Sequence, residues 1–463
     1  MNVVSDKVAN PEVNIDKLVD LGMTMMTEFE TSWPEGFHTT ILKSVITFEE
    51  KKKRLKVDGH DVMDPEAIYN QVIGLLVRQW DLYLQSVFAT ELTAYPPSMF
   101  DPDGTMHIAT GKTTLKKNLQ VKISQRNALN PIAIVVDISA LLWTLLLPVQ
   151  GTVKTFITTF KYHDYSIKSS TRKSRTTARV CKLTLQTPLP SRDAILKNYI
   201  NKVQLNKLFC QEILTDDTFL KVVTDSHVLT ITGKESIPTQ VHKGQKSLRM
   251  DLASKFEEAD GIIAQQVVAI ETSLDACVLA FAGDTNVFVL LLFFYGTSSL
   301  QSTIYMQSPV YGHCCRDIKV TYIKHNAIVP DLLAVHAISG CDPIAASYGI
   351  GKATALTVAS KGYRLDLLVD VVAKVTHVTE QAKEFMVACY GVKKCSFMTE
   401  CRQHVWTQKT GKISSAPKLC SLQPTTEAFH ENVLRAHLSS GNLVRGSGQR
   451  TPSNGSCTFW LGN

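Results

Sequence analysis

Five acidic residues have the chemistry and the spacing to bind metal ions together and to activate water. They are Asp137, Glu258, Asp260, Asp284 and Asp342. Asp137 ends the apolar run IAIVVD, and Asp284 follows the apolar run ACVLAFAG, so both are expected where strands end. Carboxylate oxygens suit Mg²⁺ or Mn²⁺, and two such ions can promote phosphodiester cleavage. We therefore predict that all five acids are catalytic and metal-binding, with Asn286 as a neutral additional ligand.

Each of these acids, taken alone, also fits a purely structural role. An Asp after a strand commonly forms a turn or caps the next helix. Glu258 follows Glu257 near the start of an expected helix, where acids stabilise the helix dipole. Residue spacing by itself leaves the structural and the metal-binding interpretations open.

Basic residues are concentrated in one short segment. Between Lys161 and Lys182 there are seven Lys or Arg and one acid. Within the stretch SIKSSTRKSR, spacings of four and three put three cations on one face of a helix, with Lys173 beside them. These three are Lys168, Arg172 and Arg175. Such a row predicts contacts with successive phosphates of a nucleic acid, and a solvated surface helix is the alternative.

A Gly-Ile-Gly-Lys turn, from Gly349 to Lys352, interrupts a region rich in small apolar residues. It is not a nucleotide-binding phosphate loop, because Ala346 replaces the first Gly and Ala353 replaces the Ser or Thr of that motif. Glycines let backbone N–H groups approach a phosphate closely. We therefore predict phosphate contacts at Gly349, Gly351 and Lys352, and a plain helical hairpin is the alternative.

Cysteine spacing argues against a zinc module. The most closely spaced set, Cys389, Cys395, Cys401 and Cys420, has intervals of six, six and nineteen residues. Paired zinc ligands usually have two to four residues between them. We therefore expect free or buried thiols here.

The pattern of apolar runs indicates three regions. Residues 1–95 look helical, 125–375 look like one α/β domain, and 376–463 look helical with a Gly/Ser-rich tail. Short apolar runs at 132–137 and 276–282 are expected to be strands, as are the run VFVLLLFFYG at 287–296 and the alternating IKVTYIK at 318–324. Buried strands that alternate with helices are typical of a mainly parallel sheet. Ligands bind beyond the carboxyl ends of such strands.

Composition indicates an ordinary globular protein. The chain has 463 residues, 44% of them hydrophobic, and a net charge of +7. No signal peptide is recognisable, and neither long apolar run is suited to span a membrane. With eleven cysteines and no Cys-x-x-Cys pair, we expect an intracellular protein with no membrane partner. The segment EEKKKRLK favours the nucleus over the cytoplasm if it acts as an import signal, and a solvated helix face is the alternative.

The order of these motifs adds a family likeness. IVVDISAL, the basic segment, EEAD, GDTNV and SGCDPIAASYGIGKATAL follow one another over roughly residues 130–360. This order resembles the PIN-like, flap-endonuclease type of nuclease domain, whose last element is a helix–two-turn–helix. Stretches such as SIKSSTRKSR and ACYGVKKCSFMTECRQHVW also resemble uncharacterised animal proteins associated with mobile elements. The resemblance implies binding of nucleic acid, DNA rather than RNA, and two Mg²⁺ or Mn²⁺ ions.

Two positions depart from the pattern that the resemblance implies. Asn286 stands where the second acid of Asp-x-Asp is expected, and Lys161 stands where an acid is usual, with Asp164 as a substitute. Three hypotheses follow: a divergent metal-dependent nuclease, an inactive nucleic-acid-binding module on the same fold, and an interaction scaffold derived from a mobile element.

Overall fold

The structure is a computed structural model of the chain. It describes 23–24, 26–27, 31, 56–57, 60–61, 88–91, 95–101, 103–109, 111–123, 131, 133–136, 151–161, 180–191, 194–195, 198–225, 227–232, 237–253, 259–274, 277–308, 315–341, 343–392, 395–410 and 418–445. The chain divides into two compact units. The first comprises 1–109, 338–351 and 379–434, and the second comprises 110–337, 352–378 and 435–463.

A five-stranded sheet forms the centre of the second unit. Its order is β3-β10-β9-β8-β4, and β4 to β8 and β8 to β9 pair in parallel. The strands are β3 Lys122–Ile123, β4 Ala133–Val136, β8 Val278–Phe281, β9 Ile304–Gln307 and β10 Cys315–Asp317. Since β10 is antiparallel to both β9 and β3, it alone runs against the other strands of this sheet. The sequence prediction of a mixed α/β fold with a mainly parallel sheet is confirmed.

Side-chain burial differs between β8, in the middle of the parallel strands, and β4, at their edge. Val278, Leu279 and Ala280 of β8 are all buried, as expected for a strand covered on both faces. In β4 only Val135 is buried, while Ile134 and Val136 are exposed. The sequence predicted both strands, because each is a short apolar run that ends at a polar turn.

Two segments that we expected to be strands are helices. Residues 287–296 lie in α11, Thr285–Thr297, and residues 318–324 lie in α12, Ile318–His325. Each helix starts after an Asp whose side chain accepts a backbone N–H of the first turn, Asp284 for α11 and Asp317 for α12. The run in α11 is buried on all sides, and a helix that is apolar all round lacks the period that distinguishes it from a strand.

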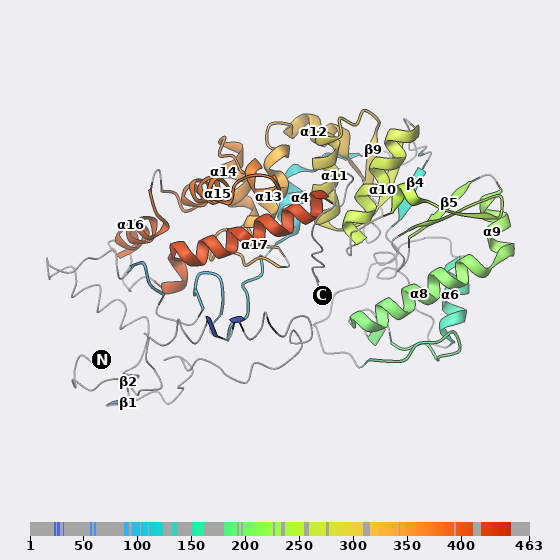
Figure 1. Ribbon diagram of the computed structural model, residues 1–463, viewed down its shortest axis with the longest axis horizontal. Coiled ribbons are helices and arrows are strands. Elements are labelled where there is room, and N and C mark those ends of the chain that lie inside the picture. Colours follow the sequence, from blue (N-terminus) through green and yellow to red (C-terminus); the bar gives the residue numbers. More distant parts are fainter. Residues whose placement is uncertain are drawn as a thin grey trace. The chain divides into compact units, whose positions relative to one another are not determined.

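Helices that come before, between and after these strands in the chain flank the sheet (Figure 1). Helix α11 packs against α10, α12 and α4, and α14 packs against α4. The bounds are α4 Thr113–Leu119, α10 Ala259–Leu274, α13 Val329–Ile338 and α14 Lys352–Ser360. The short 3₁₀ helices of this unit are η3 Met250–Leu252 and η4 Asp366–Leu368.

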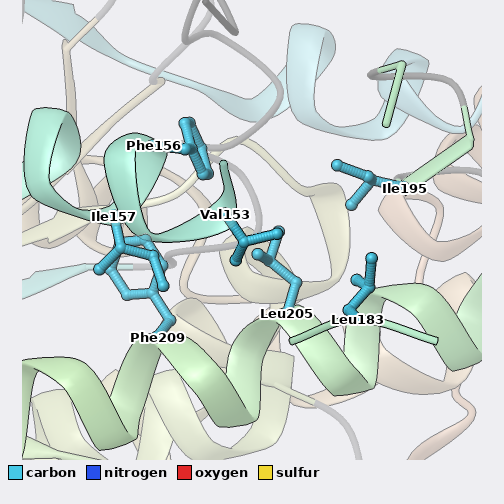
Figure 2. Close-up of a cluster of buried hydrophobic side chains, with 7 residues drawn as sticks. All are labelled: Val153, Phe156, Ile157, Leu183, Ile195, Leu205 and Phe209. Carbon is cyan, nitrogen blue, oxygen red and sulfur yellow. The ribbon is translucent and has the colours of Figure 1, made fainter. Parts of the chain in front are cut away.

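Helices α6 and α8 lie side by side and enclose a hydrophobic cluster (Figures 1 and 2). Helix α6 is Val153–Lys161 and α8 is Tyr199–Thr215. Figure 2 shows Val153 and Ile157 of α6 facing Leu205 and Phe209 of α8, and Phe156 of α6 belongs to the same cluster. Phe281, the last residue of β8, also packs against this cluster, so the end of β8 lies beside the α6–α8 pair.

A small antiparallel sheet follows α8 in the chain. Its order is β5-β6-β7, and helix α9 packs against β5 and β6. The bounds are α9 Asp217–Thr224, β5 Val228–Ile231, β6 Thr239–His242 and β7 Gln245–Leu248. The turn between β6 and β7 has positive φ at Lys243 and Gly244, and both residues donate a backbone N–H to Thr224 of α9.

The first unit joins residues 88–109 to the C-terminal helices. Its elements are most of α15 Val375–Cys389, all of α16 Met398–Thr410, η5 Leu419–Ser421 and the first part of α17 Thr426–Arg445. Arg402 of α16 is buried and forms a bidentate ion pair with Glu91, at 2.7 and 3.0 Å. Strands β1 Lys56–Val57 and β2 His60–Asp61 form a separate two-stranded pair.

No helix in the part of the chain that the structure describes is long and apolar enough to cross a membrane.

Candidate functional site at the carboxyl end of β8

The turn that follows β8 presents an acid and begins a helix. Asp284 is the N-cap of α11, and its Oδ1 accepts the backbone N–H of Asn286 at 2.9 Å. The side chain of Asp284 is exposed. The ammonium of Lys116, on α4, donates to the carbonyl oxygen of Gly283 in the same turn. The structure therefore assigns Asp284 the capping role, and this role leaves the carboxylate at the surface.

A second acid reaches this turn from α10. Asp260 lies in the first turn of α10, and its Oδ2 accepts a hydrogen bond from Nδ2 of Asn286 at 3.1 Å. Helices α10 and α11 pack together, and their first turns therefore meet near the end of β8. Two carboxylates from separate chain segments thus contact Asn286. Asp260 accepts a hydrogen bond from the side chain of Asn286, and Asp284 accepts one from its backbone N–H.

The other end of the Asn286 amide contacts a residue that the sequence analysis missed. Oδ1 of Asn286 lies 2.8 Å from Nε2 of His336, in the last turn of α13. His336 and Asp331 are both buried polar residues of α13, VPDLLAVHAI, whose remaining side chains are apolar. A histidine near the end of such an apolar segment is a signal that sequence reading could have used. The sequence analysis did not select His336, because no second histidine stands at a metal-ligand spacing from it.

Burial and two nearby positive charges lower the pKa of His336. Burial holds the pKa of His336 well below its ordinary value, and the charges of Lys352 and Lys112 act in the same direction. Lys352 is itself buried, and its ammonium donates to the backbone carbonyl of His336. The imidazole is therefore neutral at physiological pH and has one N–H to donate.

Three of the predicted acids, Asp137, Glu258 and Asp342, lie outside the described residues. Asp260 and Asp284 are brought together, with Asn286 between them. Within the described ranges, no three His, Cys, Asp or Glu side chains form a group that could hold a metal ion. The two carboxylates are the hard oxygen ligands that suit Mg²⁺ or Mn²⁺, and their donor chemistry fits such an ion. The metal site stays a prediction.

The predicted phosphate contacts of the basic segment, Lys168, Arg172, Lys173 and Arg175, also lie outside the described residues. So do Asp164 and the side chain of Lys161. The described residues on both sides of this segment contact α6 or α8 or belong to them. Helix α6 ends at Lys161, and beyond the segment the backbone N–H of Cys181 donates to Asn201 of α8 at 2.8 Å. Phe281, the last residue of β8, packs on the cluster between α6 and α8, the two helices to which the described residues on either side of this segment belong or bond.

The glycine turn is well defined. Gly349 has φ of +76°, a conformation that strongly favours glycine, and a Cβ at Gly349 or Gly351 would meet no atom within 4 Å. The backbone N–H of Tyr348 donates to Ser98 at 2.7 Å, which fixes the turn against the loop at 95–109. Open space around both glycines is compatible with the predicted approach of a phosphate, which stays a prediction.

Lys352 does not present its charge to the surface in this structure. Its side chain is 1% exposed, and the ammonium donates to the carbonyl of His336. A phosphate would reach Lys352 only after that hydrogen bond breaks. The phosphate contact at Lys352 stays a prediction, and in the structure this lysine supports the backbone of His336.

None of the four closely spaced cysteines forms a disulfide bond. Cys389 and Cys401 are buried, and Cys395 and Cys420 are half-buried. Burial raises the pKa of the Cys389 thiol to about 12 and raises that of Cys401 as well. Both thiols therefore stay protonated at physiological pH.

No family model, curated protein or solved structure matches this chain. The fold class and the site described above rest on the geometry of the chain itself.

Proposed function

We propose that this chain is a nucleic-acid-binding protein with a divergent, PIN-like nuclease domain that hydrolyses phosphodiesters with Mg²⁺. The observation that carries the proposal is the pair of carboxylates, Asp260 and Asp284, on either side of Asn286 at the carboxyl end of β8. Ligands of mainly parallel sheets bind at this edge. DNA is the preferred substrate class over RNA, as the family resemblance implies.

The described residues on either side of the basic segment support the same proposal. Its flanks are fixed to α6 and α8, and the cluster between these helices contacts Phe281, three residues before Asp284. Cations on this segment would neutralise phosphates near the two acids. A basic surface beside a carboxylate site is the arrangement that phosphodiester chemistry needs, because the substrate is a polyanion and the metal ligands are acids.

Asp260 and Asp284 would hold the ion together with the predicted ligands Asp137, Glu258 and Asp342. Bound Mg²⁺ would supply a water of lowered pKa and would stabilise the charge on the leaving oxygen. Asn286 adds no charge to this set, so the site is less negative than one with an acid at that position.

The test separates the charge of Asp284 from its capping role. Substitution Asp284→Ser keeps an N-cap side chain and removes the carboxylate. Purified wild type and Asp284→Ser are incubated with flap, hairpin and single-stranded DNA in Mg²⁺ or Mn²⁺. The matched control is Asp216→Ser, since Asp216 caps α9 by the same kind of hydrogen bond, to Phe219 at 3.0 Å. Cleavage should be lost in Asp284→Ser alone, and equal product from all three proteins would refute the enzyme proposal.

A second candidate function is a non-catalytic nucleic-acid-binding module on the same fold. It is favoured by Asn286, whose amide is engaged by Asp260 at one end and by His336 at the other. Salt-dependent DNA binding that persists in EDTA and in Asp284→Ser, without cleavage, would support it. Absence of binding at low salt would contradict both functions and leave the interaction scaffold.

A further inference from the structure

The direction of each hydrogen bond around Asn286 follows from the carboxylate of Asp260. A carboxylate only accepts hydrogen bonds, so the amide atom that faces Asp260 is Nδ2. Oδ1 then faces Nε2 of His336, which must carry the imidazole proton. The reversed amide would place Oδ1 against a carboxylate oxygen, which sets two acceptors against each other.

His336 is itself held in one position. It lies in the last turn of α13 and is 4% exposed. Its backbone carbonyl accepts a hydrogen bond from the ammonium of Lys352. Nδ1 of His336 is buried and has no hydrogen-bond partner within the described part of the chain. Burial of an unbonded nitrogen is unfavourable. An apolar residue would therefore suit this position better if His336 only filled the core.

We propose that His336 is a positioning residue that orients the Asn286 amide, so that Asn286 holds the Asp260 carboxylate in place for a divalent cation. The inference rests on the proposed function for the identity of that ligand. His336 acts through Asn286 and does not contact the cation. Because the imidazole and the amide are both neutral, the pair orients Asp260 without adding charge to the site.

The experiment measures Mn²⁺ binding to the full chain by electron paramagnetic resonance, independently of any cleavage. His336→Leu removes the donor, and His336→Gln keeps an N–H that can reach Asn286. Loss of a residue that orients a metal ligand typically lowers metal affinity by about 10–100-fold. We expect this loss for His336→Leu and most of the affinity to return in His336→Gln. The control is His437→Leu, since His437 contacts the carbonyl of Leu368 and has no part in the site.

A double variant guards against a general loss of structure. If His336 acts through Asn286, the double variant Asn286→Ala/His336→Leu binds Mn²⁺ no more weakly than Asn286→Ala. Nitrogen-15 NMR gives a second readout, because wild type should show the Nε2–H tautomer of His336 and Asn286→Ala should shift that signal. Circular dichroism checks that each variant is folded.

The outcomes separate this inference from the proposed function. Wild-type binding that His336→Leu leaves unchanged, or losses that add in the double variant, would overturn the positioning role and leave the proposed function standing. A wild type that binds no Mn²⁺ would overturn the proposed function and, with it, this inference. A His336 spectrum with the proton on Nδ1 would overturn the hydrogen-bond directions on which the positioning role rests.

Discussion

Replacement of Arg402 by Met is expected to destabilise the first unit strongly. The guanidinium is 2% exposed and pairs in bidentate fashion with Glu91, which is 13% exposed and also accepts the backbone N–H of Thr425 at 3.1 Å. Met fills much of the volume but leaves the Glu91 carboxylate buried without its cation. Loss of one partner of a buried pair costs about 3–5 kcal/mol. At about 2–4 °C per kcal/mol for a unit of this size, the melting temperature should fall by about 6–20 °C.

The measurement is thermal and urea unfolding followed by circular dichroism. The matched control is Lys246→Met, which breaks an ion pair to Asp217 whose two side chains are 42% and 78% exposed, and which should cost less than about 1 kcal/mol. The double variant Glu91→Leu/Arg402→Met should be more stable than Arg402→Met, because no charge is then left buried. A loss in Arg402→Met no larger than that in the control would refute the conclusion that residues near 91 and α16 share one core.

Two further predictions concern the site and the glycine turn. His336 stays neutral in the folded protein, whereas in the unfolded chain it takes up a proton near pH 6.5, so its contribution to the free energy of unfolding is full above that pH. This contribution should fall by about 1.4 kcal/mol between pH 7.5 and 5.5. Urea unfolding should show the loss in wild type and not in His336→Gln, and equal losses in the two proteins would contradict it. Gly349→Ala should lower the free energy of unfolding by about 1–2 kcal/mol, because Gly349 has φ of +76°. Gly351→Ala should change stability very little, because φ is not positive there. Equal stability of the two variants would contradict the turn geometry.

The sequence predicted strands β4 and β8. Runs of apolar residues that stop at a polar turn located β4 and β8, and Asp284 was expected where β8 ends. The same reasoning failed for α11 and α12. A ten-residue apolar run fits a buried helix as well as a strand, and the deciding signal was the Asp that caps each helix.

The residue types of the site were determined by the sequence, and their partners were decided by tertiary structure. Asp260 and Asp284 were chosen from sequence because carboxylates after a strand and at a helix start can bind metal. Their common contact with Asn286 exists only because α10 packs against α11. His336, fifty residues after Asn286, was marked in the sequence only as a polar residue of an apolar segment, because its contact with Asn286 depends on α13 lying beside the first turn of α11. Local periodicity sets which segments become helices and strands, but contacts between distant segments set which donor meets which acceptor.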